Sequence, residues 1–173
     1  MPRLVVKRER SRRMKIRSYT ANDLPAMLAI WNEVVEEGNA FPQEELLDEE
    51  TGAAFFAAQS RTALAEDDAK TLLGLYIMHP NNVGRCSHIA NASYAVTASA
   101  RGQHVGEALV FDSLRRARTL GFHILQFNAV VESNLRARRL YERIGFRQLG
   151  TIPRGFRLKS GQYVNICPYI YEL

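Results

Sequence analysis

The stretch Asn134-Leu135-Arg136-Ala137-Arg138-Arg139-Leu140-Tyr141-Glu142-Arg143-Ile144-Gly145-Phe146 decides the fold. Its apolar residues recur at helical spacing and form one stripe: Ala137, Leu140, Tyr141 and Ile144. Gly145 is a typical helix stop, and Phe146 begins a strand pattern. The stretch therefore predicts a helix that is buried along one side and runs directly into a strand.

The segments before this helix predict a strand and another helix. Residues 124–131 are almost continuously apolar, which is typical of a central strand that is covered on both faces. Residues 105–120 carry apolar residues on one helical face and arginines on the other, and Gly121 ends the pattern. The chain thus reads helix, strand, helix, strand from residue 105 onward.

The N-terminal half adds two helices and four strands. A strand at 16–19 precedes a helix with an apolar stripe from Leu24 to Val35, and a second helix begins after the N-cap Asp48. Three hairpin-connected strands follow at 62–65, 71–78 and 88–96, and two more end the chain at 147–152 and 164–171. This order predicts an α/β (α+β) fold, with a mixed, mostly antiparallel sheet of about six to seven strands flanked by about four helices.

The net charge of +5 does not indicate a nucleic-acid-binding domain. Residues 1–13 contain six basic residues against Glu9, which leaves 23 − 6 = 17 basic and 18 − 1 = 17 acidic residues in 14–173. We therefore predict a basic, disordered extension at 1–13 and one domain at 14–173, with no nucleic-acid partner. We expect deletion of the extension to leave turnover unchanged.

Cysteine usage and hydropathy indicate a cytoplasmic protein that does not contact membranes. Cys86 and Cys167 lack the paired spacing of a disulfide framework or a zinc site, and Cys86 with His88 offers too few ligands for a metal. No apolar run is long enough to be a signal or a membrane span. We therefore predict neither a metal nor a membrane association.

The turn Arg101-Gly102-Gln103-His104-Val105-Gly106 is a candidate phosphate site. It runs from a strand straight into a helix, so unpaired N–H groups and the positive end of the helix dipole face an incoming anion. Glycine lets the backbone approach closely, and Arg101 adds positive charge. An ordinary helix start has the same local pattern, so the turn alone leaves both interpretations open.

The two motifs together resemble the GNAT superfamily of acyl-CoA-dependent N-acetyltransferases. The turn is similar to the family's Gln/Arg-x-x-Gly-x-Gly/Ala loop, with His104 in place of the first Gly. The resemblance implies that main-chain N–H groups bind the pyrophosphate, so a side chain that points to solvent can be tolerated there. Residues 134–146 match Asn-x-x-Ala-x-x-Leu-Tyr-Glu-x-x-Gly-Phe at every anchor. The resemblance covers 14–173 and implies a GNAT fold with splayed central strands and acetyl-CoA as co-substrate.

The resemblance assigns a first set of site residues. It implies that the turn from Arg101 to Gly106, including Gln103 and Val105, binds the pyrophosphate, and that Asn134 and Ala137 contact the pantetheine arm. It also implies an oxyanion donor among the backbone N–H groups of Tyr94, Ala95 and Val96. Tyr141 is the candidate general acid, because a phenol stays protonated at neutral pH. Its alternative role is that of a core aromatic.

The acceptor site is the least determined part. Asn91 and Asn128 are amides on otherwise apolar strands, and they either satisfy each other and the backbone or act in catalysis by holding the acceptor. Glu33, Glu37 and Phe41 lie in a segment that we expect to select the substrate. Several groups could accept a proton from the amine: Glu33, Glu36, Glu37, His88 or water.

The most similar branch acts on small molecules. Residues 85–92 and 127–134 are similar to fungal enzymes that acetylate proline analogues, and the loop 36–42 resembles phosphinothricin-type acetyltransferases. The predicted acceptor is therefore a small, amino-acid-like amine that attacks directly. The alternatives are a protein N-terminal or lysine acetyltransferase, and a CoA-binding regulatory module without turnover. A homodimer is a further expectation, because Tyr163, Tyr169 and Tyr171 could pair the last strand across an interface or close a monomeric sheet.

Overall fold

Four α-helices cover an eight-stranded sheet in the computed structural model, which describes residues 13–173. The predicted extension at 1–13 lies outside the described residues except for Arg13. The helices are α1 (Leu24–Glu37), α2 (Glu49–Ala57), α3 (Val105–Thr119) and α4 (Leu135–Ile144). The strands are β1 (Met14–Ser18), β2 (Arg61–Asp67), β3 (Leu72–Pro80), β4 (Ile89–Val96), β5 (Ile124–Val131), β6 (Arg147–Gln148), β7 (Ile152–Arg157) and β8 (Tyr163–Glu172).

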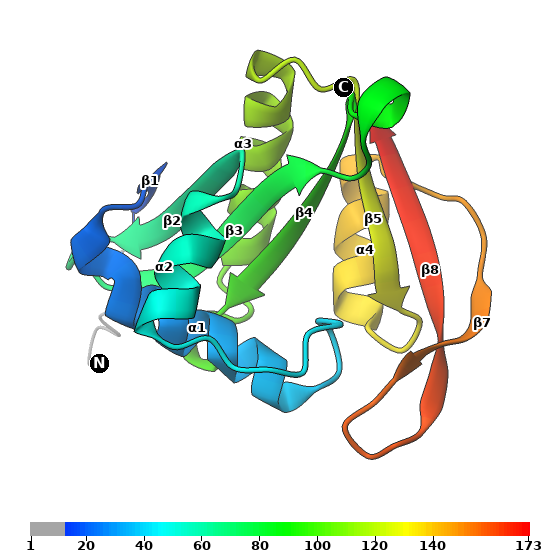
Figure 1. Cartoon of the computed structure of the whole chain (residues 1–173), viewed down its shortest axis with the longest axis horizontal. Helices are drawn as coiled ribbons and strands as arrows, with labels where there is room; N and C mark the ends of the chain where they lie inside the picture. Colours follow the sequence, from blue (N-terminus) through cyan, green and yellow to red (C-terminus); the bar gives the residue numbers. More distant parts are fainter. Residues whose placement is uncertain (1–12) are drawn as a thin grey trace, which may run out of the picture.

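The sheet is mixed and mostly antiparallel, as predicted. Its order is β1-β2-β3-β4-β5-β8-β6, with β7 also paired to β8. The pair β4–β5 is parallel, and the other pairs are antiparallel. In Figure 1, β4 and β5 lie together at the top and diverge toward the bottom. The splay of the two central strands is therefore a feature of the backbone.

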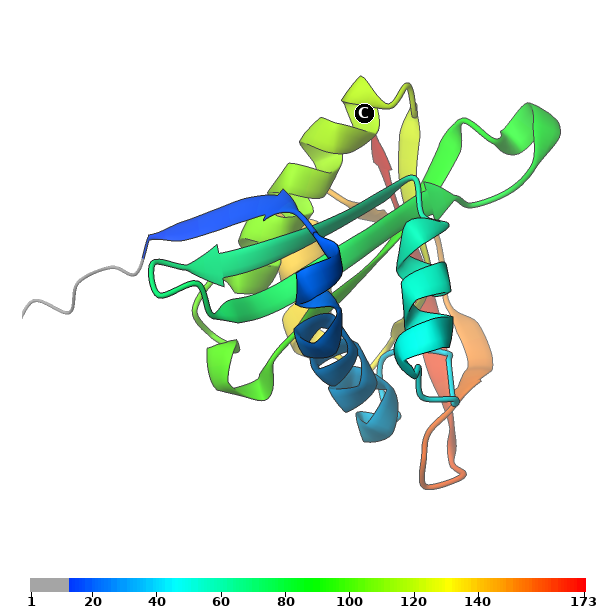
Figure 2. The same ribbon diagram turned by 60° about the vertical axis from the view of Figure 1, so that its left-hand side comes forward.

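The helices form two layers, one on each face of the sheet. The stripe predicted for α1 is buried and packs with α2 against the first face, where Trp31 contacts Phe41 and Phe56. Helices α3 and α4 cover the second face, where Leu109 is fully buried. Figure 2 shows α1 and α2 on one side of the sheet and α3 on the other. The two helix layers thus form separate hydrophobic clusters, one on each face of the sheet.

The helix ends follow the residue types that the sequence supplies. Asp48 caps α2 by accepting a hydrogen bond from Thr51 N at 2.8 Å, and Gly38 ends α1 in the left-handed conformation. Gly145 ends α4 in the same way, with φ of 113°. The predicted ends of these helices are confirmed within a few residues.

The strands after Phe146 differ from the prediction of a single strand at 147–152. Strand β6 stops after Gln148 because the next partner on β8 is Pro168, which accepts a hydrogen bond from Leu149 N but has no N–H to return one. Pairing resumes at Ile152 as a separate strand, β7. The sheet thus has eight strands in place of six to seven.

Strand β5 is central in the sheet but is not covered equally on its two faces, which corrects the prediction of double coverage. Leu125 and Phe127 are buried beneath α3 and α4, whereas Asn128 on the opposite face is exposed. The pairing of β5 with β8 is irregular between Phe127 and Val130. The exposed face begins where β4 and β5 separate.

Candidate active site

The two central strands separate after three registered pairs. Ile89 lies opposite Ile124 and Asn91 opposite Gln126, and the ladder ends there. Asn91 Nδ2 donates to Gln126 O at 2.9 Å, so this amide satisfies the backbone at the last pair. On the side of α3 and α4, the rings of Tyr94 and Phe127 meet edge to face, with centroids 5.8 Å apart. An aromatic floor thus lies beneath the opening.

Main-chain groups of β4 are free along one side of the opening. Thr97 N donates to Leu73 O at 3.0 Å, which fixes the phase of the antiparallel ladder between β3 and β4. Odd-numbered residues of β4 therefore direct their N–H and C=O groups at β3, and even-numbered residues direct theirs at the splay. Tyr94 and Val96 accordingly present main-chain groups to the opening.

Ala95 does not share this position, which corrects its place among the predicted cofactor-binding residues. The phase of the ladder turns its N–H toward β3, and its methyl group is fully buried in the core beneath α1. Ala95 therefore faces away from the opening on both its main-chain and side-chain sides.

The N-terminus of α3 is not capped by a side chain. The first hydrogen bond within the helix runs from Ala108 N to His104 O at 3.1 Å, and no side chain accepts from the first turn. The N–H groups of Val105, Gly106 and Glu107 are therefore free of intrahelical partners, and the positive end of the helix dipole lies with them. Unpaired N–H groups and the positive end of the dipole therefore coincide at the turn where the sequence predicts an anion site, and the contact with phosphate stays a prediction.

His104 lies in the left-handed conformation, with φ of 62°. It occupies the position at which the motif has glycine, and its side chain is 79% exposed and points away, with Nδ1 2.8 Å from Glu107 Oε2. This is the orientation in which a side chain can be tolerated at this position of the turn, and the effect of His104 on CoA binding stays a prediction. Gly102, with φ of 83°, supplies the other left-handed residue of the turn. The backbone thus keeps the shape of the loop at the cost of strain at His104.

His104→Gly is expected to raise the free energy of unfolding by about 0.5 kcal/mol. The left-handed conformation costs a residue with Cβ about 1–2 kcal/mol, and the added freedom of glycine in the unfolded chain returns about 0.4–1 kcal/mol of this. Chemical denaturation measures the change, and Lys70→Gly, with φ of 65° outside the loop, is the matched control. A loss of stability in His104→Gly alone would contradict the assignment of strain.

A cleft of about 610 Å³ joins the opening, the turn and α4. Predicted site residues that line it are Glu37, Tyr94, Val96, Arg101, Gly102, His104, Val105, Gly106, Asn134, Ala137 and Tyr141. Gln103 does not line it, because its side chain turns back to Ser99 O at 2.9 Å. The cleft has the size of sites that hold small molecules and cofactors.

Two arginines of α4 line the cleft and were missed by the sequence argument. Arg136 and Arg143 add positive charge beside the turn, and Arg143 donates to Glu107 Oε1 at 2.9 Å. Hydrogen bonds from His104 and then Arg143 lower the pKa of Glu107, so this carboxylate stays ionised and neutralised by its neighbours. The sequence signal that could have identified them is their position on α4, the same short helix as Ala137 and Tyr141, which were predicted to lie at the site.

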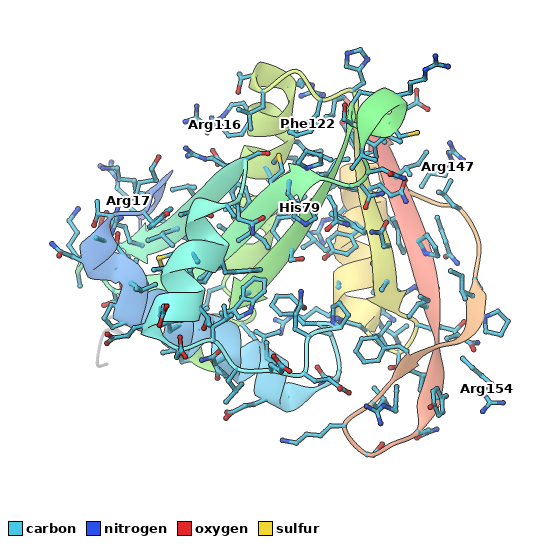
Figure 3. All side chains as sticks on the ribbon, in the orientation of Figure 1. Arg17, His79, Arg116, Phe122, Arg147 and Arg154 are labelled. Atoms are coloured by element: carbon cyan, nitrogen blue, oxygen red, sulfur yellow. The ribbon has the colours of Figure 1, made fainter. Side chains whose placement is uncertain are left out.

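Three exposed arginines outside the cleft do not gather into one charged face. Arg116, Arg147 and Arg154 are exposed and lie well apart from one another, Arg147 and Arg154 along one side of the molecule and Arg116 on α3 (Figure 3). A nucleic-acid-binding surface requires clustered positive charge. Across residues 13–173, the cationic groups that converge on a cavity are those of the cleft.

Tyr141 lies in the cleft on the aromatic floor. Its ring centroid is 4.5 Å from that of Phe127 and 5.6 Å from that of Phe146. No group within the described residues hydrogen-bonds to its hydroxyl, and burial, followed by the effect of Tyr169, raises the pKa of the Tyr141 phenol well above its ordinary value. The hydroxyl is therefore protonated at neutral pH and free to donate.

Asn134 is first of all a helix cap. Its Oδ1 accepts a hydrogen bond from Ala137 N at 3.2 Å at the start of α4. Both residues also line the cleft, so the cap places the first turn of α4 beside the opening. The contact with a pantetheine arm stays a prediction.

The predicted acceptor residues are not all brought together. Asn128 is exposed and accepts from Gln126 while donating to Asn81 at 2.6 Å, which corrects the expectation of a buried amide that pairs with Asn91. Phe41 is buried against Trp31 with centroids 4.5 Å apart and belongs to the core, because the loop after α1 folds back over that helix.

The acids on α1 also separate into different environments. Glu33 lies outside the cleft and accepts from Ala98 N at 3.4 Å, and Glu36 is exposed. Glu37 lines the cleft. His88 lies elsewhere, in a second hollow with His123. Of the side chains proposed as a base, Glu37 is therefore the one that lines the same cavity as Tyr141.

Three further expectations concern the cysteines, metal binding and membrane-spanning helices. Cys86 is exposed and Cys167 is buried, and both are free thiols. Within residues 13–173 there is no group of three or more side chains arranged to hold a metal, and none of the helices is long and apolar enough to cross a membrane. The cytoplasmic location stays a prediction.

The open mixed sheet that splays beside an uncapped helix N-terminus agrees with the fold that the resemblance to acyl-CoA-dependent N-acetyltransferases implies. The acetyltransferase (GNAT) family matches residues 25–146, more than half of the chain, and the chain belongs to this family. This confirms the family that the turn and the motif at 134–146 indicated.

Individual relatives support the same placement. N-acetyltransferase aca1 of Schizosaccharomyces pombe is 40% identical over 112 residues, 64% of this chain and 53% of that protein, so the chain spans about half the length of this relative. A methionine sulfoximine/methionine sulfone acetyltransferase of Pseudomonas paraeruginosa is 30% identical over 80% of this chain and 83% of its own. A GCN5-related N-acetyltransferase structure from Kribbella flavida is 36% identical, with a TM-score of 0.86 over 92% of this chain and 98% of that one.

Proposed function

We propose that this protein transfers the acetyl group of acetyl-CoA to the amine of a small, amino-acid-like molecule by direct attack. The observation that carries the proposal is the single cleft that joins the uncapped N-terminus of α3 to the hydroxyl of Tyr141. Acetyl-CoA supplies a thioester carbonyl that is open to attack by an amine and a thiolate as leaving group.

The chain's own residues fit this co-substrate. The free N–H groups at Val105, Gly106 and Glu107 would hold phosphate oxygens, and the neighbouring arginines would neutralise their charge. The groups that β4 directs at the splay offer N–H donors where a carbonyl oxygen gains negative charge. Orphan donors at both places give the fit a structural basis, independent of the motif.

Tyr141 would act as the general acid. Its hydroxyl is protonated at neutral pH, lies in the same cleft and has no competing partner among the described groups. It can therefore deliver its proton to a sulfur that becomes basic as the bond to carbon breaks. The ring is held by Phe127 and Phe146, which fixes the direction of the hydroxyl.

A small acceptor is favoured by the relative from Pseudomonas paraeruginosa, whose substrates by name are amino-acid analogues, and by the carboxylate of Glu37 in the cleft. An amino acid carries an ammonium group, which a carboxylate binds well.

The test is thiol release from acetyl-CoA across a panel of amino acids, amino-acid analogues, amine antibiotics, polyamines and peptides. We expect release with amino acids or their analogues, and a product heavier by one acetyl group in mass spectrometry. Reactions without acceptor are the blank. Release with peptides alone would overturn the small-molecule acceptor, and tight CoA binding without release from any acceptor would favour a regulatory module.

The homodimer also stays a proposal, but one route to it is wrong. Strand β8 lies between β5 and the pair β6 and β7, so both of its edges are already hydrogen-bonded. Tyr169 on this strand is fully buried. The last strand therefore cannot pair across an interface.

A further inference from the structure

The side chain of Arg101 contacts two other residues that line the cleft. Its Nη2 donates to Glu37 Oε1 at 2.6 Å, and its Nε lies 3.4 Å from Val96 O, a carbonyl directed at the splay. The contact with Glu37 joins the turn before α3 to the end of α1, two elements 64 residues apart. Figure 1 shows the end of α1 beneath the open side of the two diverging strands.

The C-terminal end of α1 carries negative charge that a cation would stabilise. Glu36 and Glu37 are its last residues, at the negative end of the helix dipole, and the last turn contains no basic residue. Lys159 reaches in from the β7–β8 hairpin, but its Nζ donates to the main-chain oxygen of Glu36 at 2.9 Å. The carboxylate of Glu37 is thus left with Arg101 as its cationic partner.

The second acid of the cleft is already neutralised. Glu107 accepts from both His104 and Arg143, and neither of these contacts involves Arg101. If Arg101 turned elsewhere, Glu37 would therefore become the carboxylate of the cleft that lacks a cation.

If CoA binds as proposed, its pyrophosphate is a stronger partner for Arg101 than Glu37 is. The pair with Glu37 is partly exposed, with side-chain exposures of 35% and 30%, and such pairs are weak. A guanidinium binds a phosphate through two parallel hydrogen bonds, and a pyrophosphate carries more negative charge than one carboxylate. The N–H groups of the turn place such an anion in the same cleft as Arg101.

We propose that Arg101 and Glu37 form a switch that couples the two substrates. On binding of CoA, Arg101 exchanges Glu37 for the phosphates, and the freed carboxylate binds the ammonium group of the acceptor. Glu37 is thus an acceptor-specificity residue that is masked in the free protein. This inference rests on the proposed function, because it requires CoA at the turn.

The switch predicts an order of binding. The acceptor binds weakly to the free protein, where Glu37 is occupied, and more tightly to the CoA complex. Because coupling between two ligands is reciprocal, the acceptor must tighten CoA by the same factor. CoA itself meets a cost in the free protein, since it must break the ion pair.

The experiment is calorimetric titration of CoA into the wild type, Glu37→Gln and Glu36→Gln. Glu36 is the matched control, because it is the preceding acid on the same helix turn but is exposed and outside the cleft. We expect Glu37→Gln to bind CoA about threefold more tightly than the wild type, because this factor corresponds to the free energy of an exposed ion pair. Glu36→Gln should bind CoA with the same affinity as the wild type. High salt should remove the difference.

A double-mutant cycle isolates the pair. In an Arg101→Ala background, Glu37→Gln should leave the Kd of CoA unchanged, because no ion pair remains to be broken. A second readout moves in the opposite direction: with L-methionine sulfone as acceptor probe, Glu37→Gln should raise the acceptor KM about tenfold through loss of a charged hydrogen bond. Tighter CoA together with weaker acceptor is a pattern that a general loss of structure cannot give.

The outcomes separate the switch from the function on which it rests. If the wild type binds CoA and transfers acetyl groups, but Glu37→Gln and Glu36→Gln bind CoA equally, the switch is wrong and the function stands. If the wild type does not bind CoA, the proposed function fails as well. Should Glu37→Gln be unfolded by circular dichroism, Glu37→Asp takes its place, because the shorter side chain breaks the contact while keeping the charge.

Discussion

Tyr141→Phe is expected to lower kcat by roughly 100-fold or more, with little change in the KM for acetyl-CoA. Phenylalanine keeps the ring contacts with Phe127 and Phe146, so the variant removes a proton donor and leaves the aromatic floor in place. The loss falls on kcat because the hydroxyl acts as the sulfur becomes basic, after the substrates are bound. Steady-state kinetics with an acceptor identified in the panel measures the effect.

The pH profile adds a second readout for the same residue. Burial raises the pKa of Tyr141, so the group remains protonated, and able to donate, over the whole range below its ordinary value of about 10. Wild-type turnover should therefore show no alkaline decline from this group up to about pH 10.

Tyr163→Phe is the matched control for Tyr141→Phe, since Tyr163 is an exposed tyrosine outside the cleft. Full turnover in Tyr141→Phe would return Tyr141 to the role of a core aromatic.

Gly106→Asp is expected to weaken CoA binding by about 100-fold or more without loss of the fold. An added carboxylate would stand in the first turn of α3, among the N–H groups that face the cleft, and would repel phosphate at close range. An acid in the first turn of a helix stabilises that helix, so the melting temperature should be unchanged or higher. Titration calorimetry and thermal unfolding together separate lost binding from lost structure.

The control for this variant is Gly106→Ala. A Cβ built at Gly106 lies 3.9 Å from both Leu140 Cδ2 and Val96 Cγ2, which is ordinary contact. Alanine should therefore bind CoA within about threefold of the wild type, below about 1 kcal/mol. Equal affinity in the aspartate and alanine variants would place the phosphates elsewhere.

Local patterns predicted the helices well because helices depend on neighbours in the sequence, and the resemblance of two separate motifs to one family indicated the cleft that joins them. The stripes of α1 and α4 and their glycine stops follow from helical periodicity, and the motif anchors Asn134 and Tyr141 do line one cavity with the turn. The side chain of His104 points to solvent, which is the orientation that the departure from glycine can tolerate, but the sequence alone did not predict this orientation.

The failures share a different cause, namely pairing between distant segments. The split between β6 and β7 depends on Pro168 in a strand about twenty residues away. The exclusion of Ala95 depends on the phase of its ladder with β3, which no property of β4 alone reveals. Asn128 was expected to be buried because its strand is apolar, but the sheet opens on that face. Long-range geometry decided each of these positions.

The separation of β4 from β5 has a mechanical consequence. Three registered pairs, from Ile89–Ile124 to Asn91–Gln126, and one main-chain hydrogen bond just before them, from His123 N to His88 O, join a half-sheet of β1 to β4 to a half-sheet of β5 to β8. Each half is stiffened by its own antiparallel ladders, so bending concentrates at this short seam. A ligand bound in the cleft would contact both half-sheets and restrict their motion relative to each other. Occupancy of the site and rigidity of the whole sheet would then rise and fall together.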